Sequence, residues 1–100
     1  MKEGEGLKRI LVACGQGVAT STMVLGRLKG AMEKRGLDGK YTVVQCKVLE
    51  ILSKADGFDF VIATAQMPPG LKIPGVNGVP ILTGIGVEKV YDQIAELIRA

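Results

Sequence analysis

Apolar and polar residues follow one another along this chain in the manner of an α/β protein. Short apolar or β-branched runs predict strands at residues 8–13, 41–46, 58–64 and 79–82. Apolar residues recur at helical spacing over residues 18–35, 48–53 and 87–99, which predicts helices there. Residues 66–78 are rich in proline and glycine, so we expect a loop between the last two strands.

Alternating strands and helices predict a single-domain α/β fold. We expect an open, four-stranded parallel sheet with helices on both faces, a Rossmann-like arrangement. Right-handed crossovers favour the strand order 2-1-3-4, which puts a topological switch point between the first and third strands. Ligands of such sheets bind at the carboxyl ends of the strands near that point. We divide the chain into a flexible tail, residues 1–7, and one domain, residues 8–100.

The two long predicted helices each carry one apolar stripe. In the first helix the stripe has helical spacing and consists of Ser21, Val24, Leu25, Leu28, Ala31 and Met32. In the last helix the inward positions are Val87, Val90, Tyr91, Ile94, Leu97 and Ile98. Gly26 and Gly30 interrupt the first helix and weaken it slightly, and we expect them to allow close packing on the sheet.

Composition narrows the class of protein. The chain has 100 residues, of which 47% are hydrophobic and only 4% aromatic, so we expect one aliphatic core. Its net charge is +3, with scattered cations and few stacking residues, which argues against a nucleic-acid surface. No apolar run approaches the length of a membrane span, and the charged start is unlike a signal peptide. We therefore expect a cytoplasmic protein.

The segment with the clearest chemistry follows the first predicted strand and opens the first predicted helix. It reads Cys14, Gly15, Gln16, Gly17, Val18, Ala19, Thr20 and Ser21. Its glycines let successive amide N–H groups converge on an anion, and a helix N-terminus adds unsatisfied N–H groups and a positive dipole. The same surroundings lower the pKa of a thiol from about 8.5. The segment therefore predicts a phosphate-sized cup with a thiol nucleophile, Cys14, at its edge.

Several other kinds of site do not fit the sequence. The chain contains no histidine, which excludes Cys–His and Ser–His catalytic pairs. We find no cluster of metal ligands, and neither the nucleotide P-loop pattern nor a dinucleotide fingerprint, so we predict no metal and no cofactor. The second cysteine, Cys46, ends the second predicted strand, and we interpret it as a core or lining residue. An inert, buried Cys14 remains the alternative to a nucleophile.

These residues resemble a known family. Val12-Ala13-Cys14-Gly15 followed by Val18-Ala19-Thr20-Ser21-Thr22-Met23 is similar to the phosphocysteine loop of IIB components of the bacterial phosphoenolpyruvate-dependent sugar phosphotransferase system (PTS), above all of the galactitol type. Gln45-Cys46-Lys47-Val48, Gly78-Val79-Pro80 and Thr83-Gly84-Ile85-Gly86 add softer matches. The likeness runs from about residue 8 to the end, but residues 66–77 share little with the family.

The resemblance implies a role. Such domains take a phosphoryl group from a phosphohistidine of a IIA protein and give it to a sugar or polyol held by a IIC membrane transporter. Cys14 matches the phosphorylated cysteine, and residues 15–21 match the loop that holds the phosphate. The resemblance thus implies a phosphotransferase that works at the inner face of the membrane through IIC.

Two other functions are also compatible with these residues. A low-molecular-weight tyrosine phosphatase also places a cysteine loop between a strand and a helix, but its Cys-x5-Arg loop needs an arginine where this chain has Thr20. A phosphatase also needs an acid for the leaving group, and no aspartate lies in a suitable loop. The third possibility is a non-catalytic anion-binding or redox domain in which Cys14 and Cys46 form a disulfide.

Overall fold

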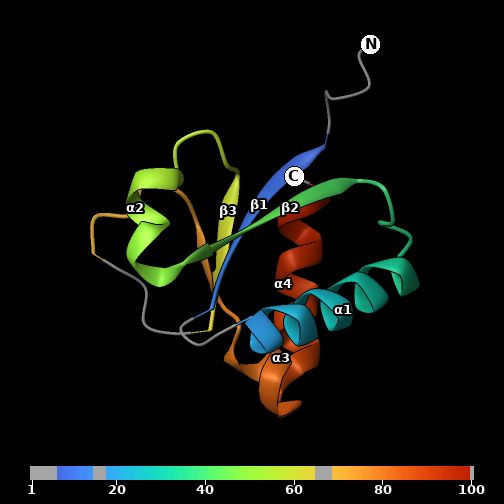
Figure 1. Ribbon diagram of the computed structural model, residues 1–100. Helices are drawn as coiled ribbons and strands as arrows, with labels where there is room; N and C mark the ends of the chain where they lie inside the picture. Colours follow the sequence, from blue (N-terminus) through green and yellow to red (C-terminus); the bar gives the residue numbers. More distant parts are fainter. Residues whose placement is uncertain (1–6, 15–17, 65–68, 100) are drawn as a thin grey trace.

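The computed structural model describes residues 7–14, 18–64 and 69–99, with only the backbone for residues 14 and 18–21 (Figure 1). In chain order the elements are β1 (Lys8–Cys14), α1 (Val18–Lys34), β2 (Tyr41–Lys47), the 3-10 helix η1 (Val48–Glu50), α2 (Ile51–Lys54), β3 (Phe60–Ala63), β4 (Gly75–Asn77), α3 (Val79–Thr83) and α4 (Val87–Arg99).

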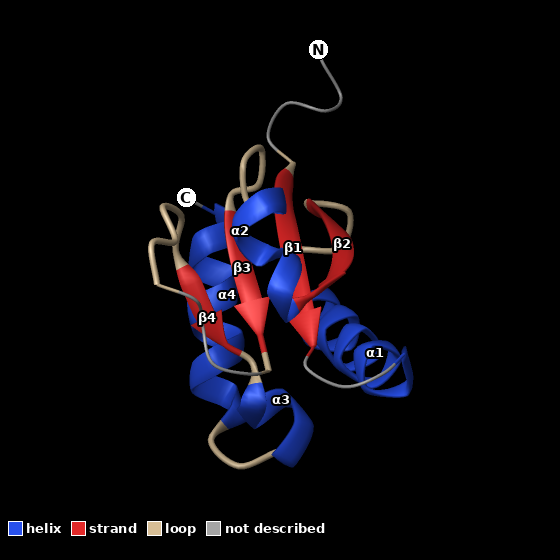
Figure 2. Ribbon diagram, turned by 60° about the vertical axis from the view of Figure 1, so that its left-hand side comes forward, coloured by secondary structure: helices blue, strands red, loops and turns tan. Residues whose placement is uncertain are grey.

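The four strands form one parallel sheet in the order β2-β1-β3-β4, which confirms the predicted topology. Strand β1 is central: its residues Ile10–Ala13 pair with Phe60–Ala63 of β3, and all seven of its residues pair with β2. Because the strands are parallel, all four end at the same edge, which we call the carboxyl edge. Figure 2 shows the strand arrows pointing to this edge, with α3 lying beyond it.

Helices cover both faces of the sheet, as predicted. Side chains of β1 alternate between the faces, so Ile10 and Val12 pack in the larger hydrophobic cluster with α1 and α4, while Leu11 and Ala13 pack in the smaller one with α2. Figure 1 shows α1 and α4 together on one side of the sheet and α2 on the other. The first face therefore carries most of the core.

The predicted helix stripes are largely confirmed. In α1, Val24, Leu28, Ala31 and Met32 are buried, and Leu25 is partly buried against them. The side chain of Ser21, the first residue of the predicted stripe, lies outside the described part of the chain. In α4 the buried residues are Val90, Tyr91, Ile94, Ala95 and Ile98, with Val87 and Leu97 partly buried. Helical periodicity located these faces because an amphipathic helix has one way to bury its stripe.

The prediction for the fourth strand was wrong. Residues 79–82 form most of helix α3, whereas β4 lies within the stretch predicted as a loop. The Asn77 side chain accepts the Val79 N–H at 3.0 Å, and Pro80 stands in the first helical turn, where a missing N–H costs nothing. β4 buries one side chain, that of Val76, and this is too short an apolar signal to show in the sequence.

The prediction for the two helical glycines was also wrong. A Cβ atom built on Gly26 or on Gly30 would meet no atom of another part of the chain within 4 Å. Gly26 is exposed and Gly30 is half-buried, whereas the buried stripe of α1 runs through other residues. These glycines therefore do not serve close packing of α1 on the sheet, and open space lies above them.

Candidate functional site

The candidate nucleophile lies where the sequence placed it, at the carboxyl edge. Cys14 is the last residue of the central strand β1, and its backbone pairs with Lys47 at the end of β2. The chain leaves β1 towards α1 and β2 on one side, and it later returns to β3 on the other side. This is the topological switch point of the sheet, where ligands of open α/β sheets bind.

The predicted anion cup joins β1 to α1. Its residues Gly15, Gln16 and Gly17 lie outside the described residues. Val18, Ala19, Thr20 and Ser21 form the first turn of α1, whose backbone is helical from Val18 onwards. The end of a central strand and the start of a helix of 17 residues are thus only three residues apart. The first amide groups of a helix have no partner within the helix, so α1 begins with free donors close in sequence to the end of β1.

Main-chain hydrogen bonds organise the other side of the switch point. The Thr64 N–H donates to Ala13 O at 3.0 Å, so the chain that leaves β3 is tied to the residue before Cys14. The Gly78 N–H in turn donates to Ala63 O at 2.7 Å. A Cβ atom on Gly78 would come within 2.8 Å of Ile62 Cγ2, so only glycine fits this approach. Sequence reasoning missed both contacts, because they join residues that are distant along the chain.

Arg27 ties α1 to α3. Its Nη1 donates to Ile81 O at 2.7 Å and to Leu82 O at 3.0 Å. The last carbonyls of a helix lack partners within the helix, so a cation there stabilises α3 and its dipole. This contact holds the helix that carries the predicted cup against the segment that follows β4. No local sequence pattern marks Arg27, because its partners lie 54 and 55 residues further along the chain.

The segment after α3 makes a tight turn. Gly84 adopts a left-handed conformation (φ 81°) that ends α3, and its N–H donates to Pro80 O at 2.7 Å. The Thr83 hydroxyl accepts a hydrogen bond from the Ile85 N–H at 3.2 Å. The Ile85 side chain in this turn is 80% exposed. The motif Thr83-Gly84-Ile85-Gly86 thus forms a turn that presents an apolar side chain to solvent.

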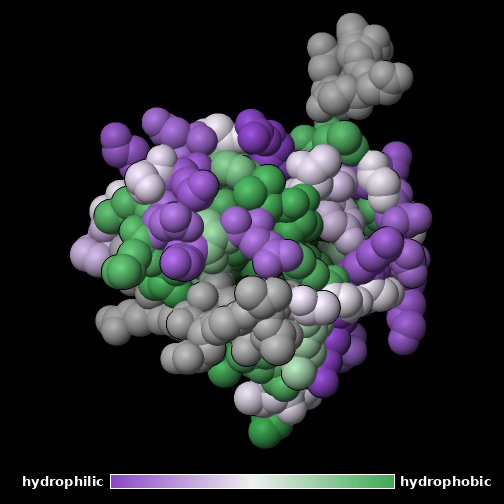
Figure 3. Space-filling view, viewed as in Figure 1, coloured by the Kyte–Doolittle hydropathy of each residue, from purple (hydrophilic) through white to green (hydrophobic). Residues whose placement is uncertain are grey.

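Two other exposed apolar residues lie in elements that begin at the carboxyl edge. Leu49 in η1 is 95% exposed, and Val79 at the start of α3 is 38% exposed. On the face seen in Figure 3, hydrophobic residues reach the surface over α2 and at α3, among hydrophilic neighbours. Such large apolar side chains in water suit contact with another protein.

Cys46 occupies a different setting. It pairs with Ala13 in the ladder between β1 and β2, and it is partly buried against the smaller cluster. This agrees with its interpretation as a core or lining residue. The ladder offsets Cys46 from Cys14 by one position, since Cys14 pairs with Lys47.

Two acidic side chains near the strands accept hydrogen bonds from backbone N–H groups. Asp59 accepts the Arg9 N–H at 2.7 Å, and Glu50 accepts the Lys47 N–H at 3.0 Å. In the parts of the chain that the structure describes, no group of three or more potential metal ligands comes together. The same parts contain no helix that is both long and apolar enough to cross a membrane.

Among the side chains that the structure describes, the shifted pKa values lie away from the carboxyl edge. Burial, followed by the nearby charges of Asp38 and Glu33, raises the pKa of Tyr41 at the opposite end of β2. Hydrogen bonds to Asp92 and Glu88 raise the pKa of Arg35. The described side chains with shifted pKa values thus belong to other parts of the fold than the end of β1.

Comparison with known proteins identifies relatives of this chain. The chain is 35% identical to the phosphotransferase enzyme IIB component SgcB of Escherichia coli (strain K12), over 92% of this chain and 98% of that protein. It is 33% identical to the galactitol-specific EIIB component of the PTS from the same organism, over 92% of this chain and 97% of that protein.

A solved structure shows the same fold. The cellobiose-specific phosphotransferase IIB component from Borrelia burgdorferi superposes with a TM-score of 0.56 at 20% identity, covering 95% of this chain and 91% of that one. Residues 9–99 also match the family described as PTS system, Lactose/Cellobiose specific IIB subunit. The chain therefore belongs to this PTS IIB family, and it is a phosphotransferase component of a sugar phosphotransferase system.

Proposed function

We propose that Cys14 carries the phosphoryl group, which it accepts from a phosphohistidine of a IIA protein and passes to a sugar or polyol held by a IIC membrane transporter. The observation that supports this most strongly is the position of Cys14. It ends the central strand at the switch point, and a long helix begins just beyond it. The proposed place of action is the cytoplasmic face of the membrane, where IIC opens.

The backbone around Cys14 provides the electrostatics for this role. We propose that the amide groups of residues 15–21 hold the phosphoryl oxygens, with the hydroxyls of Thr20 and Ser21 as further donors. The positive end of the α1 dipole favours the thiolate before transfer and the phosphate after it. One arrangement thus activates the nucleophile and stabilises the product, without a histidine.

The two proposed transfers are in-line displacements at phosphorus. In the first, the Cys14 thiolate forms an S–P bond while the N–P bond of the donor phosphohistidine breaks, and the imidazole keeps the electron pair. In the second, a hydroxyl oxygen of the acceptor forms an O–P bond as the S–P bond breaks, which regenerates the thiolate. The hydroxyl proton leaves to solvent or to a base on the transporter. Both steps depend on positioning rather than on acid–base groups of this chain.

The surface at the carboxyl edge supports docking of these partners. Leu49 and Ile85 are largely exposed in segments that follow β2 and α3, on either side of the switch point. Both would lose apolar contact with water when a partner covers the edge. The absence of histidine from the full sequence fits a receiver of phosphate from a phosphohistidine, since the chain cannot itself form one.

For the acceptor we propose a hexitol of the galactitol kind. The support is the names of three relatives: the proteins with 32–33% identity over 97% of their length are all galactitol-specific EIIB components. The phosphatase and redox alternatives are not favoured. The residue six positions after Cys14 is Thr20 and not the arginine of a phosphatase loop.

The test is phosphoryl transfer to purified protein. The chain is mixed with phosphoenolpyruvate, the general phosphotransfer proteins and a galactitol-type IIA, and mass spectrometry locates the phosphate. We expect it on Cys14, no phosphate on the Cys14→Ser variant, and normal labelling of the matched control Cys46→Ser. Equal labelling of Cys14→Ser would overturn the assignment of the nucleophile. Turnover of p-nitrophenyl phosphate by the native chain would instead point to a hydrolase.

A further inference from the structure

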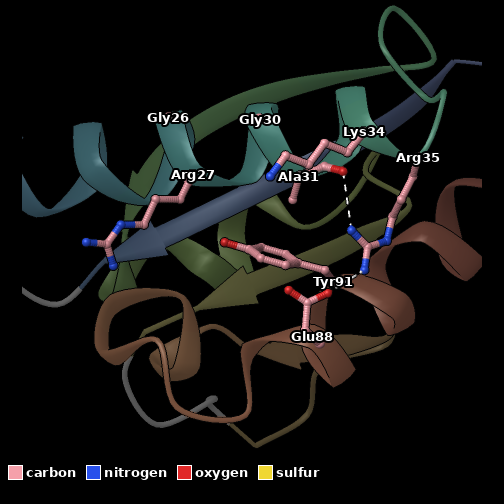
Figure 4. Close-up of a pocket in the computed structure, with 8 residues that line it drawn as sticks. All are labelled: Gly26, Arg27, Gly30, Ala31, Lys34, Arg35, Glu88 and Tyr91. Atoms are coloured by element: carbon pink, nitrogen blue, oxygen red, sulfur yellow. Dashed lines mark hydrogen bonds and ion pairs between the residues drawn. The ribbon is translucent and has the colours of Figure 1, made fainter.

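A groove between α1 and α4 lies outside the candidate site. It has a volume of about 270 Å³, and α1 lines it with Gly26, Arg27, Gly30, Ala31 and Lys34. Arg35, Glu88 and Tyr91 close its other side (Figure 4). Apart from Arg27, which also binds α3, none of these residues contributes to the carboxyl edge. The groove runs along the second half of α1, which leads away from Cys14.

The floor of the groove is open because of the two glycines. Neither Gly26 nor Gly30 has any atom of another part of the chain near the position of a Cβ. Glycine in the middle of a helix is unfavourable relative to alanine, and here no contact within the chain offsets that cost. The glycines do, however, let another molecule approach the backbone of α1 closely.

The side chain of Tyr91 also faces this groove. It is only 8% exposed, and its hydroxyl has no hydrogen-bond partner in the described parts of the chain. Figure 4 shows the ring lying beneath α1, with the hydroxyl pointing along the groove towards the Arg27 side. Burial raises the pKa of this phenol above its ordinary value of 10.0, and the charge of Arg27 opposes that rise. No side-chain oxygen or nitrogen among the described residues is both fully buried and unpaired, so solvent reaches this hydroxyl through the groove. It can therefore both donate a hydrogen bond to a bound molecule and accept one from it.

The charged side chains that line the groove indicate which kind of ligand it binds. Three cations, Arg27, Lys34 and Arg35, line the groove together with one carboxylate, that of Glu88. Arg35 is compensated, since its Nη2 lies 3.1 Å from Glu88 and 3.0 Å from Asp92. The Lys34 side chain folds back along α1 towards the glycines in Figure 4. Arg27 and Lys34 therefore leave a surplus of positive charge beside the Tyr91 hydroxyl.

We propose that this groove binds a phosphomonoester of a small polyhydroxy compound. Lys34 binds the phosphate, and the positive charge of Arg27, which α3 holds in place, favours the anion. The Tyr91 hydroxyl and the Glu88 carboxylate bind hydroxyl groups of the ligand. The volume lies just below the usual range of ligand sites, about 300–1,000 Å³, which suits a compound of sugar size. A second copy of the chain fits poorly, because a two-fold contact would bring the same cations together. This site is separate from Cys14 and does not depend on the proposed transfer.

The test uses the full-length chain with three probes: sorbitol 6-phosphate, sorbitol and inorganic phosphate. Binding is followed by amide NMR shifts and by tyrosine fluorescence in a Tyr41→Phe variant. In this variant Tyr91 is the single tyrosine of a chain without tryptophan, so the signal reports on the groove. We expect saturable binding of the phosphate ester, with shifts at Gly26, Gly30 and Tyr91. Weaker binding is expected for phosphate, and none for sorbitol.

Matched variants separate the groove from the phosphate cup. Lys34→Gln should weaken binding by roughly tenfold or more, as expected for the loss of a charge-assisted hydrogen bond. Lys29→Gln is the control, because Lys29 is exposed on the same helix outside the groove lining. Gly30→Leu should abolish binding by filling the groove, and Tyr91→Phe should weaken it while keeping the ring. Cys14→Ser should leave it unchanged.

Three results would overturn the proposal. The first is no saturable binding of sorbitol 6-phosphate at millimolar concentration. The second is binding that survives Gly30→Leu but disappears in Cys14→Ser, which would place the ester at the end of β1. The third is a Tyr91 signal that responds to an acidic helical peptide and not to the ester, which would make the groove a protein-docking surface. An amide NMR spectrum typical of a folded protein, recorded for each variant, excludes misfolding as the cause of these outcomes.

Discussion

The carboxyl edge of the sheet and the layer of α1 and α4 are built in different ways. The layer packs large side chains that are fully buried, among them Leu28, Met32 and Ile94. The edge is held by main-chain hydrogen bonds and by glycine, as in the approach of Gly78 to Ala63. The layer therefore provides most of the stability, whereas the edge sets the geometry around Cys14. Substitutions in the two regions should separate stability from phosphoryl transfer.

The largest effect on stability is expected in the layer. Ile94 is fully buried in the middle of α4, so Ile94→Ala removes buried apolar surface and leaves a cavity. We expect the free energy of unfolding to fall by about 2–5 kcal/mol, measured by urea denaturation. Phosphoryl transfer per folded molecule should stay near normal, because the cavity lies away from the edge.

Glu96→Ala is the control for this change. Glu96 is exposed on the same helix, and its loss should alter the free energy of unfolding by no more than about 0.5 kcal/mol. If Ile94→Ala slowed transfer in its folded fraction as much as it lowered stability, the separation between layer and edge would be wrong.

A smaller loss of stability, with a larger effect on chemistry, is expected at the edge. Gly78→Ala brings a Cβ to 2.8 Å from Ile62 Cγ2 and 3.3 Å from Ala63 O, both in a packed strand. Such overpacking costs about 1–3 kcal/mol of unfolding free energy. Relief of the clash moves the end of β3 and Thr64, which is bonded to the residue before Cys14.

We therefore expect Gly78→Ala to slow phosphorylation of Cys14 beyond its effect on the folded fraction. Single-turnover transfer from a phosphorylated IIA, at a temperature where the variant is fully folded, measures this. An unchanged transfer rate together with the expected destabilisation would show that the edge tolerates movement of β3.

The smallest expected change in the free energy of unfolding is an increase. Gly30→Ala adds a methyl group in open space on α1 and removes the conformational freedom of a helical glycine. We expect the free energy of unfolding to rise by about 0.5–1 kcal/mol. Thermal melting of this variant beside Gly78→Ala compares the same substitution in the two regions. Destabilisation by Gly30→Ala would mean that the groove is more tightly packed than the structure shows.

Much of the fold was predictable because its signals are local. Helical spacing identified the buried faces of α1 and α4, and the β-branched run from Tyr41 identified β2. The strand order followed from right-handed crossovers and the alternation of elements. The candidate nucleophile was also predictable, since a cysteine between a buried strand and a glycine-rich helix start forms one continuous segment.

The sequence by itself determined the α/β pattern, the family and the position of Cys14 at the end of a strand, because each is encoded in neighbouring residues. Only the tertiary structure decided the rest. It made residues 79–83 a helix, turned Gly26 and Gly30 towards open space, and brought Arg27 to the carbonyls of α3. These outcomes depend on contacts between distant segments, and a short apolar run or a lone glycine carries too little local preference to determine them.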